Sequence, residues 1–72
     1  SDNNEEEWRN IFSKNLIRKI YRCGMTQDML AYEIGVTPVM INRYVKGRAT
    51  PSAYMLKRIA DTLRCSITEL VY

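Results

Sequence analysis

Apolar residues recur at helical spacing along the first third of the chain. They are Trp8, Ile11, Phe12, Leu16 and Ile20. This spacing is typical of one face of an amphipathic helix. Asn4 is a candidate cap because Glu7 follows three residues later, and Gly24 can end the helix in a left-handed conformation. The pattern therefore predicts a long first helix.

A short second helix is predicted over 27–34. Thr26 precedes it as a cap candidate, and Gly35 marks its end. Its apolar face consists of Leu30, Ala31 and Ile34. Only Val36 lies between Gly35 and the next start signal, so the connection to the next helix must be tight.

That start signal is Thr37 followed by Pro38, since threonine caps helices and proline in the first turn loses no needed hydrogen bond. The pattern predicts a third helix over 38–46, closed by Gly47. Its inward-facing residues should be Ile41, Tyr44 and Val45.

Two more helices are predicted downstream. Ser52 can cap a fourth helix, whose apolar stripe is Leu56, Ile59, Ala60 and Leu63. Ser66 and Glu69 then have the spacing of a capping box, which opens a last short helix. Strand-like alternation is absent from the sequence, so we expect an all-α fold of five helices.

The length of 72 residues allows one small domain, which we place at 5–72 behind an acidic and polar tail at 1–4. A chain of this size has little room for a core and a deep substrate cleft. The sequence contains no histidine, no glycine-rich phosphate loop and no nucleophile beside a base. We therefore expect no catalytic residues and no enzymatic activity.

Cys23 and Cys65 are the only cysteines, too few for a zinc site in a chain without histidine. We expect them to be free thiols, as in a reducing compartment, with a single disulfide between them as the alternative. No apolar run approaches the roughly 20 residues of a membrane span, and the first residues do not resemble a signal peptide. The sequence therefore predicts a cytoplasmic protein with no metal, no cofactor and no membrane contact.

Charge is distributed unevenly along the chain. The four acidic residues before Arg9 are Asp2, Glu5, Glu6 and Glu7. Residues 8–72 hold all eleven Lys and Arg against four acidic residues, which leaves +7. A basic body of this size suits a polyanionic partner.

The most informative stretch is 26–47, where two short helices are joined by a Gly-containing turn. Such a link sets the helices at a steep angle, in the helix-turn-helix arrangement. Ala31 must be small where the helices cross, and Gly35 must accept a left-handed backbone. The sequence from Asn15 to Val71 resembles the phage-repressor-like (XRE-type, lambda-repressor-like) helix-turn-helix domain. The segments that carry the resemblance are Met25-Thr26-Gln27, Leu30-Ala31, Ile34-Gly35-Val36-Thr37, Ile41-Asn42-Arg43-Tyr44, Gly47, Pro51-Ser52, Leu63, Ser66 and Glu69-Leu70.

The resemblance implies a DNA-binding domain of five helices whose third helix enters the major groove. Its base-contacting positions correspond here to Pro38, Val39 and Arg43. Its phosphate-contacting positions correspond to Gln27, Arg48, Thr50 and Ser52. We add Thr37 to the expected phosphate contacts.

Helical geometry supports some of the DNA contacts that the resemblance implies. Val39, Asn42, Arg43 and Lys46 are spaced i, i+3, i+4 and i+7, so they share one face. Arg43 can bind guanine through O6 and N7, Asn42 can bind adenine or a phosphate, and Val39 can contact a thymine methyl. Lys46 would hold phosphate without carrying sequence information.

Pro38, Val39 and Met40 are apolar, where the family usually has polar residues. Direct readout would then depend on Arg43 and Asn42, with DNA shape supplying the rest. Alternatively, the chain is a protein–protein interaction module that docks a partner on this apolar surface. Little salt dependence of binding and a buried Val39 side chain would distinguish that alternative.

Two further departures affect packing. The positions of an Arg–Glu pair that many family members bury are Ile20 and Val45 here, so the pair is replaced as a unit. Met29 and Tyr32 are apolar at usually polar positions. We expect the extension of the first helix, with Trp8, to fold back over this surface, although the surface can also be read as a dimer face.

These observations predict a sequence-specific regulator of transcription that binds double-stranded DNA. We expect a repressor that occupies a palindromic operator as a homodimer. The protein would be bacterial or phage-encoded and associated with the nucleoid when bound to DNA.

Overall fold

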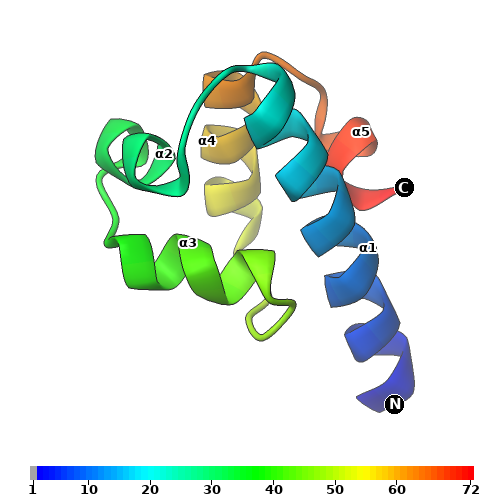
Figure 1. Ribbon diagram of the computed structural model, residues 1–72. Coiled ribbons are helices and arrows are strands. Elements are labelled where there is room, and N and C mark those ends of the chain that lie inside the picture. Colours follow the sequence, from blue (N-terminus) through cyan, green and yellow to red (C-terminus); the bar gives the residue numbers. More distant parts are fainter. Residues whose placement is uncertain (1) are drawn as a thin grey trace.

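Five α-helices joined by short turns make up residues 2–72, the part of the chain that the computed structural model describes (Figure 1). The helices are α1 (Asp2–Arg22), α2 (Gln27–Ile34), α3 (Pro38–Val45), α4 (Ala53–Leu63) and α5 (Ile67–Val71). No strand occurs within this range. The predicted all-α fold of five helices, with an extended N-terminal helix, is confirmed.

The start of α1 differs from the prediction. The helix begins at Asp2, so Asn4 lies inside the first turn instead of capping it, and the expected tail at 1–4 is helical from Asp2 onward. Ser1 lies outside the described residues. Carboxylates near a helix N-terminus are stabilised by the helix dipole, and Glu5 also pairs with Arg9 one turn later, at 3.2 Å. Both effects favour helix upstream of the apolar stripe.

The predicted caps are present at the other four helix starts. The hydroxyl oxygens accept hydrogen bonds from backbone N–H groups three residues later, for Thr26, Thr37, Ser52 and Ser66. Ser66 and Glu69 form a complete capping box. At its C-terminus α3 is one residue shorter than predicted, because Lys46 has left helical geometry and serves as the C-cap. Capping signals are local, which explains the close agreement between prediction and structure.

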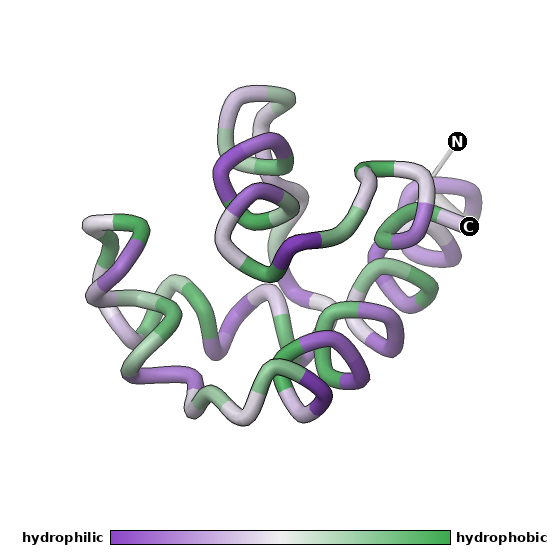
Figure 2. Tube along the Cα trace, turned by 90° about the horizontal axis from the view of Figure 1, so that it is seen from above, coloured by the Kyte–Doolittle hydropathy of each residue, from purple (hydrophilic) through white to green (hydrophobic). Residues whose placement is uncertain are grey.

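The helices pack in a closed ring around the core, with α1 against α3, α3 against α2, α2 against α4, α4 against α5 and α5 against α1. Along each helix apolar and polar residues alternate, as the colours of the tube show (Figure 2). The core consists of Phe12, Leu16, Ile20, Leu30, Ala31, Ile34, Ile41, Tyr44, Ile59, Ala60, Leu63 and Leu70. Every predicted helix contributes to it, so no helix is dispensable for burial.

Aromatic packing connects α1 to α3. Trp8 stacks on Phe12 with ring centroids 5.5 Å apart, and Phe12 meets Tyr44 edge-on at 5.9 Å. The extension of α1 therefore packs beside the C-terminal half of α3. Met29 and Tyr32 stay 50% and 85% exposed. The expectation that the extension folds back over them is wrong, because a continuous helix carries Trp8 towards Tyr44.

Cys23 and Cys65 are both free thiols. The Cys23 Sγ–H donates to the carbonyl oxygen of Leu63 at 3.1 Å, and burial raises the pKa of the Cys65 thiol. Among residues 2–72, no helix is both long enough and apolar enough to cross a membrane.

Candidate nucleic-acid interface

The turn between α2 and α3 fixes the angle at which the two helices meet. Gly35 adopts φ +83°, which residues with a Cβ rarely accept. In this conformation the backbone N–H groups of Gly35 and Val36 both donate to the carbonyl oxygen of Ala31, at 2.9 and 3.0 Å. Ala31 itself is buried. The turn thus has the geometry that the sequence predicted for a helix-turn-helix.

The outer face of α3 presents the residues predicted to contact bases. Pro38, Val39, Asn42 and Arg43 are all exposed. Val39 keeps 69% of its surface accessible, whereas Ile41 and Tyr44 on the opposite side are buried. Desolvation on burial raises the pKa of Tyr44, and the neighbouring Arg43 opposes this shift. Tyr44 is therefore a neutral residue that packs into the core, and the opposite face of α3 is left towards solvent.

Asn42 and Gln27 contact each other across the two helices. The Asn42 amide Nδ2 donates to Gln27 Oε1 at 3.3 Å. The structure thus brings a predicted base-contact residue beside a predicted phosphate-contact residue, at the N-terminus of α2. Sequence reasoning missed this bond, because it depends on the crossing angle of the helices.

Two predicted phosphate-contact residues also cap helices. Thr37 Oγ1 accepts from the Met40 N–H at 3.3 Å, and Ser52 Oγ accepts from the Met55 N–H at 3.0 Å. A hydroxyl that accepts a bond still has its own hydrogen to donate. Both side chains are exposed, so capping leaves each of them able to donate to an anion.

The loop after α3 is held by the first turns of α1. Arg9 Nε donates to the carbonyl oxygen of Gly47 at 3.1 Å, and Ser13 Oγ donates to that of Val45. Thr50 Oγ1 donates to Glu5 Oε2 at 2.9 Å. These α1 residues were not predicted to belong to the site. The spacing of Glu5 and Arg9 indicates an ion pair, but nothing local indicates a contact with a loop some forty residues away.

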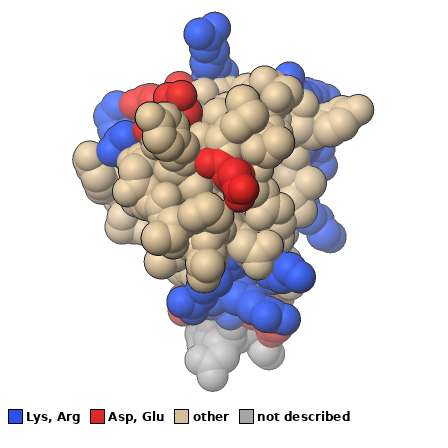
Figure 3. Space-filling model, turned by 60° about the vertical axis from the view of Figure 1, so that its left-hand side comes forward, with Lys and Arg blue, Asp and Glu red and all other residues tan. Residues whose placement is uncertain are grey.

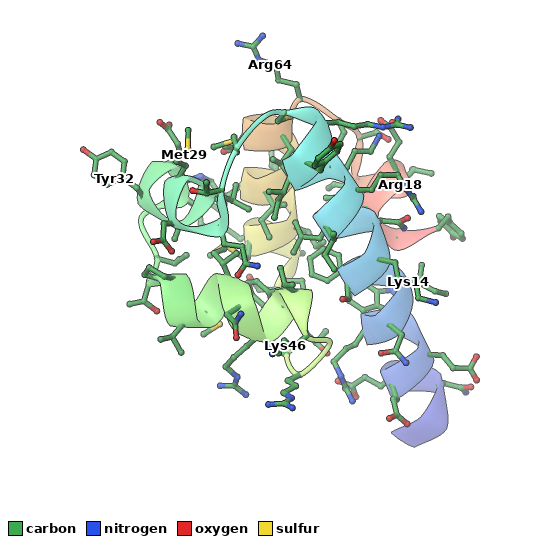
Figure 4. All side chains as sticks on the ribbon, in the orientation of Figure 1. Lys14, Arg18, Met29, Tyr32, Lys46 and Arg64 are labelled. Atoms are coloured by element: carbon green, nitrogen blue, oxygen red, sulfur yellow. The ribbon has the colours of Figure 1, made fainter. Side chains whose placement is uncertain are left out.

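Positive charge is available on the α3 side of the molecule. Arg43, Lys46 and Arg48 are exposed, and no carboxylate of residues 4–72 forms an ion pair with them. By contrast, Lys57 pairs with Asp61 and Lys19 with Glu69, each at 2.8 Å. Figure 3 shows Lys and Arg side chains gathered at the end of the molecule that carries the first turns of α1. In Figure 4, Lys46 lies in the lower half of the view, towards the end with the first turns of α1, whereas Arg64 projects from the top.

The two apolar residues at the positions of the family's Arg–Glu pair lie at one cleft. Ile20 and Val45 both line it, and its volume is about 270 Å³. The remaining lining residues are Ile17, Tyr21, Met25, Thr26 and Gln27. Apolar side chains of α1 and of the C-terminal end of α3 thus meet at the positions where the resemblance implies an ion pair in other family members.

The apolar surface predicted for a protein partner is smaller than expected. Met40 is partly buried and packs against the core, so only Pro38 and Val39 project fully. Within the described residues, no group of three or more His, Cys, Asp or Glu side chains could hold a metal ion.

Comparison with known proteins agrees with this geometry. A family model described as helix-turn-helix matches residues 16–70. The solution structure of the SOS-response transcriptional repressor LexA from Eubacterium rectale is similar, with a TM-score of 0.86 and 32% sequence identity. The match covers 92% of this chain and 70% of that one. Among curated proteins, no sequence matches significantly.

Proposed function

The chain belongs to the XRE-type helix-turn-helix family of DNA-binding regulators, and on that premise we propose that it represses transcription by occupying a specific operator. The observation that carries the proposal is the outer face of α3. Arg43 is exposed on this face and Lys46 follows it as the C-cap, and neither forms an ion pair with the carboxylates of residues 4–72. Free cations on an accessible helix suit a groove lined by phosphates.

In the proposed complex α3 lies in the major groove. Arg43 reads guanine through O6 and N7, and Val39 contacts a thymine methyl. Asn42 reads adenine from the orientation that Gln27 gives it. Pro38 adds apolar contact at the start of the helix, and the shape of the duplex supplies the remaining discrimination.

Phosphate contacts would surround this face. Gln27 and Thr37 lie at the N-termini of α2 and α3, where backbone N–H groups also favour anions. Lys46, Arg48, Thr50 and Ser52 extend the contact along the loop after α3. These contacts fix the register of the protein on DNA and carry no sequence information themselves.

We further propose a homodimer on a palindromic operator, because one face with few base-reading side chains specifies only a short half-site. The bacterial origin of the LexA structure supports a bacterial or phage-encoded regulator that acts in the cytoplasm.

A selection from a random library of DNA duplexes tests the proposal, carried out on the purified chain at low and at near-physiological salt. We expect an enriched palindrome at both salt concentrations, whose half-site spacing gives the dimer geometry. Weak binding without enrichment that disappears as salt rises would contradict the proposal. It would favour a protein partner docked on Pro38 and Val39 instead.

A further inference from the structure

A hydroxyl and a guanidinium from distant parts of the chain converge on a single carboxylate oxygen. Thr50 Oγ1 donates to Glu5 Oε2 at 2.9 Å, and Arg9 Nη1 lies 3.2 Å from the same oxygen. Since Thr50 follows α3 and Arg9 belongs to α1, the donors meet only because the loop lies against that helix.

The rest of the Arg9 guanidinium is fixed to the loop. Its Nε donates to the carbonyl oxygen of Gly47 at 3.1 Å. The loop approaches α1 closely here, since a Cβ on Gly47 would lie 3.0 Å from Asn10 Oδ1. The Arg9 side chain is only 25% exposed, whereas that of Glu5 is 59% exposed. The donors are therefore held in place, and the carboxylate that they bind is open to solvent.

A phosphate oxygen accepts hydrogen bonds from the same groups, a hydroxyl and a guanidinium, that here converge on one carboxylate oxygen. The same loop carries Lys46 and Arg48, exposed and unpaired with any carboxylate of residues 4–72. A phosphate placed on this loop would thus find two further cations within a few residues of Thr50.

We propose that Thr50 and Arg9 form an anion site for a backbone phosphate of DNA, and that Glu5 occupies this site while the protein is free. The inference rests on the proposed DNA-binding function and adds Arg9 to its contacts. Glu5 then lowers affinity for every DNA sequence alike, because a phosphate carries no sequence information. The N-terminal extension of α1, upstream of the matched residues 16–70, becomes part of the interface.

Replacing Glu5 tests the proposal, with Glu6 as the matched control. Glu6 is exposed and makes no ion pair or side-chain hydrogen bond with residues 4–72. Glu6→Gln therefore removes the same single negative charge as Glu5→Gln without removing such a contact. On the selected operator and on a random duplex of equal length, we expect Glu5→Gln to bind about twofold to fivefold more tightly, the effect of one exposed ion pair. Glu6→Gln should change affinity less on both duplexes. Equal effects of the two substitutions would overturn the inference.

A second variant separates competition at the site from general repulsion. Thr50→Val removes the hydroxyl at an exposed position with little change of shape. In that background we expect Glu5→Gln to gain less affinity than in the wild type. An undiminished gain would show that Glu5 acts only through its charge, and would overturn the site.

Arg9→Gln should make the fall of log affinity with log salt less steep by about 0.9, the value for one lost phosphate contact. The control Lys14→Gln should leave the slope unchanged, and thermal unfolding establishes that both variants fold. If the wild type selects no operator, the proposed function fails. If it selects one while the Glu5 and Glu6 variants behave alike, only this inference fails.

Discussion

Asn42 and Gln27 share a hydrogen bond of 3.3 Å between their side-chain amides, although they are fifteen positions apart in sequence. The sequence assigned them separate tasks, one at a base or phosphate and the other at a phosphate. Their contact means that a change at Gln27 also alters the orientation of Asn42. In the proposed complex we therefore expect the effects of the two residues on DNA affinity to be coupled.

This coupling can be measured with Gln27→Ala and Asn42→Ala. In the wild-type background we expect Gln27→Ala to weaken operator binding more than random-duplex binding, because it frees Asn42. In the Asn42→Ala background it should weaken both duplexes by the same factor, as the loss of a phosphate contact does. Titrations of all four proteins on both duplexes provide the test. A loss confined to the operator in the Asn42→Ala background would show that Gln27 reads bases.

Arg43→Ala should reduce affinity for the operator by about 1–3 kcal/mol and relax the preference at one base pair. The reason is the loss of a bidentate contact that only guanine offers in the major groove. Arg18→Ala is the control, since Arg18 is exposed on α1 (Figure 4). A repeated library selection with each variant reads out the preference. Uniform weakening on all sequences would place Arg43 at a phosphate.

Phe12→Ala should lower the free energy of unfolding by about 3–5 kcal/mol, as for other fully buried aromatic residues. Phe12 is fully buried and packs against both Trp8 and Tyr44. Urea unfolding followed by circular dichroism measures the loss. The neighbouring Ile11 is exposed, so Ile11→Ala should cost far less. Similar losses for both variants would mean that the aromatic packing contributes little.

Acid should destabilise the fold through Glu69. The hydrogen bond from Lys19, followed by that from the Ser66 backbone, lowers the Glu69 pKa from 4.5 to about 2. The folded chain thus keeps the carboxylate ionised at a pH where the unfolded chain protonates it. Its stabilising effect is complete above pH 4.5 and is lost as the pH falls through about 2.

Unfolding measured across this pH range tests the role of Glu69. Glu69→Gln should show a weaker pH dependence than the wild type, because the titrating group is gone. Glu33 is an exposed carboxylate that forms no ion pair with residues 4–72, so Glu33→Gln should follow the wild-type profile. A wild-type profile for Glu69→Gln would contradict the assignment.

The elements that the sequence predicted well are those set by local signals. Thr26, Thr37, Ser52 and Ser66 cap the helices that their neighbours begin, because a cap depends on residues within one turn. The apolar stripes likewise identified the buried residues of α2 and α4, since the helical period alone determines which positions share a face.

Contacts between distant segments were not predictable in the same way. The bonds of Arg9 to Gly47 and of Thr50 to Glu5 join residues 38 and 45 positions apart. They depend on where α1 passes the loop, which no short pattern encodes. The expected position of Trp8 was wrong for the same reason, because the direction of the extension follows from the whole fold.

The two ends of α3 are attached to different neighbours. Its N-terminal end is joined to α2 through the turn at Gly35, and its C-terminal end is held by Ser13 and Arg9 of α1. These contacts at both ends oppose tilting of the helix towards an imperfect DNA sequence. In the proposed complex we therefore expect the protein to keep its shape at a mismatched operator, so that the duplex has to bend or twist to meet it. On the proposed function, the stiffness of base-pair steps that no side chain touches would then contribute to which operators the domain prefers.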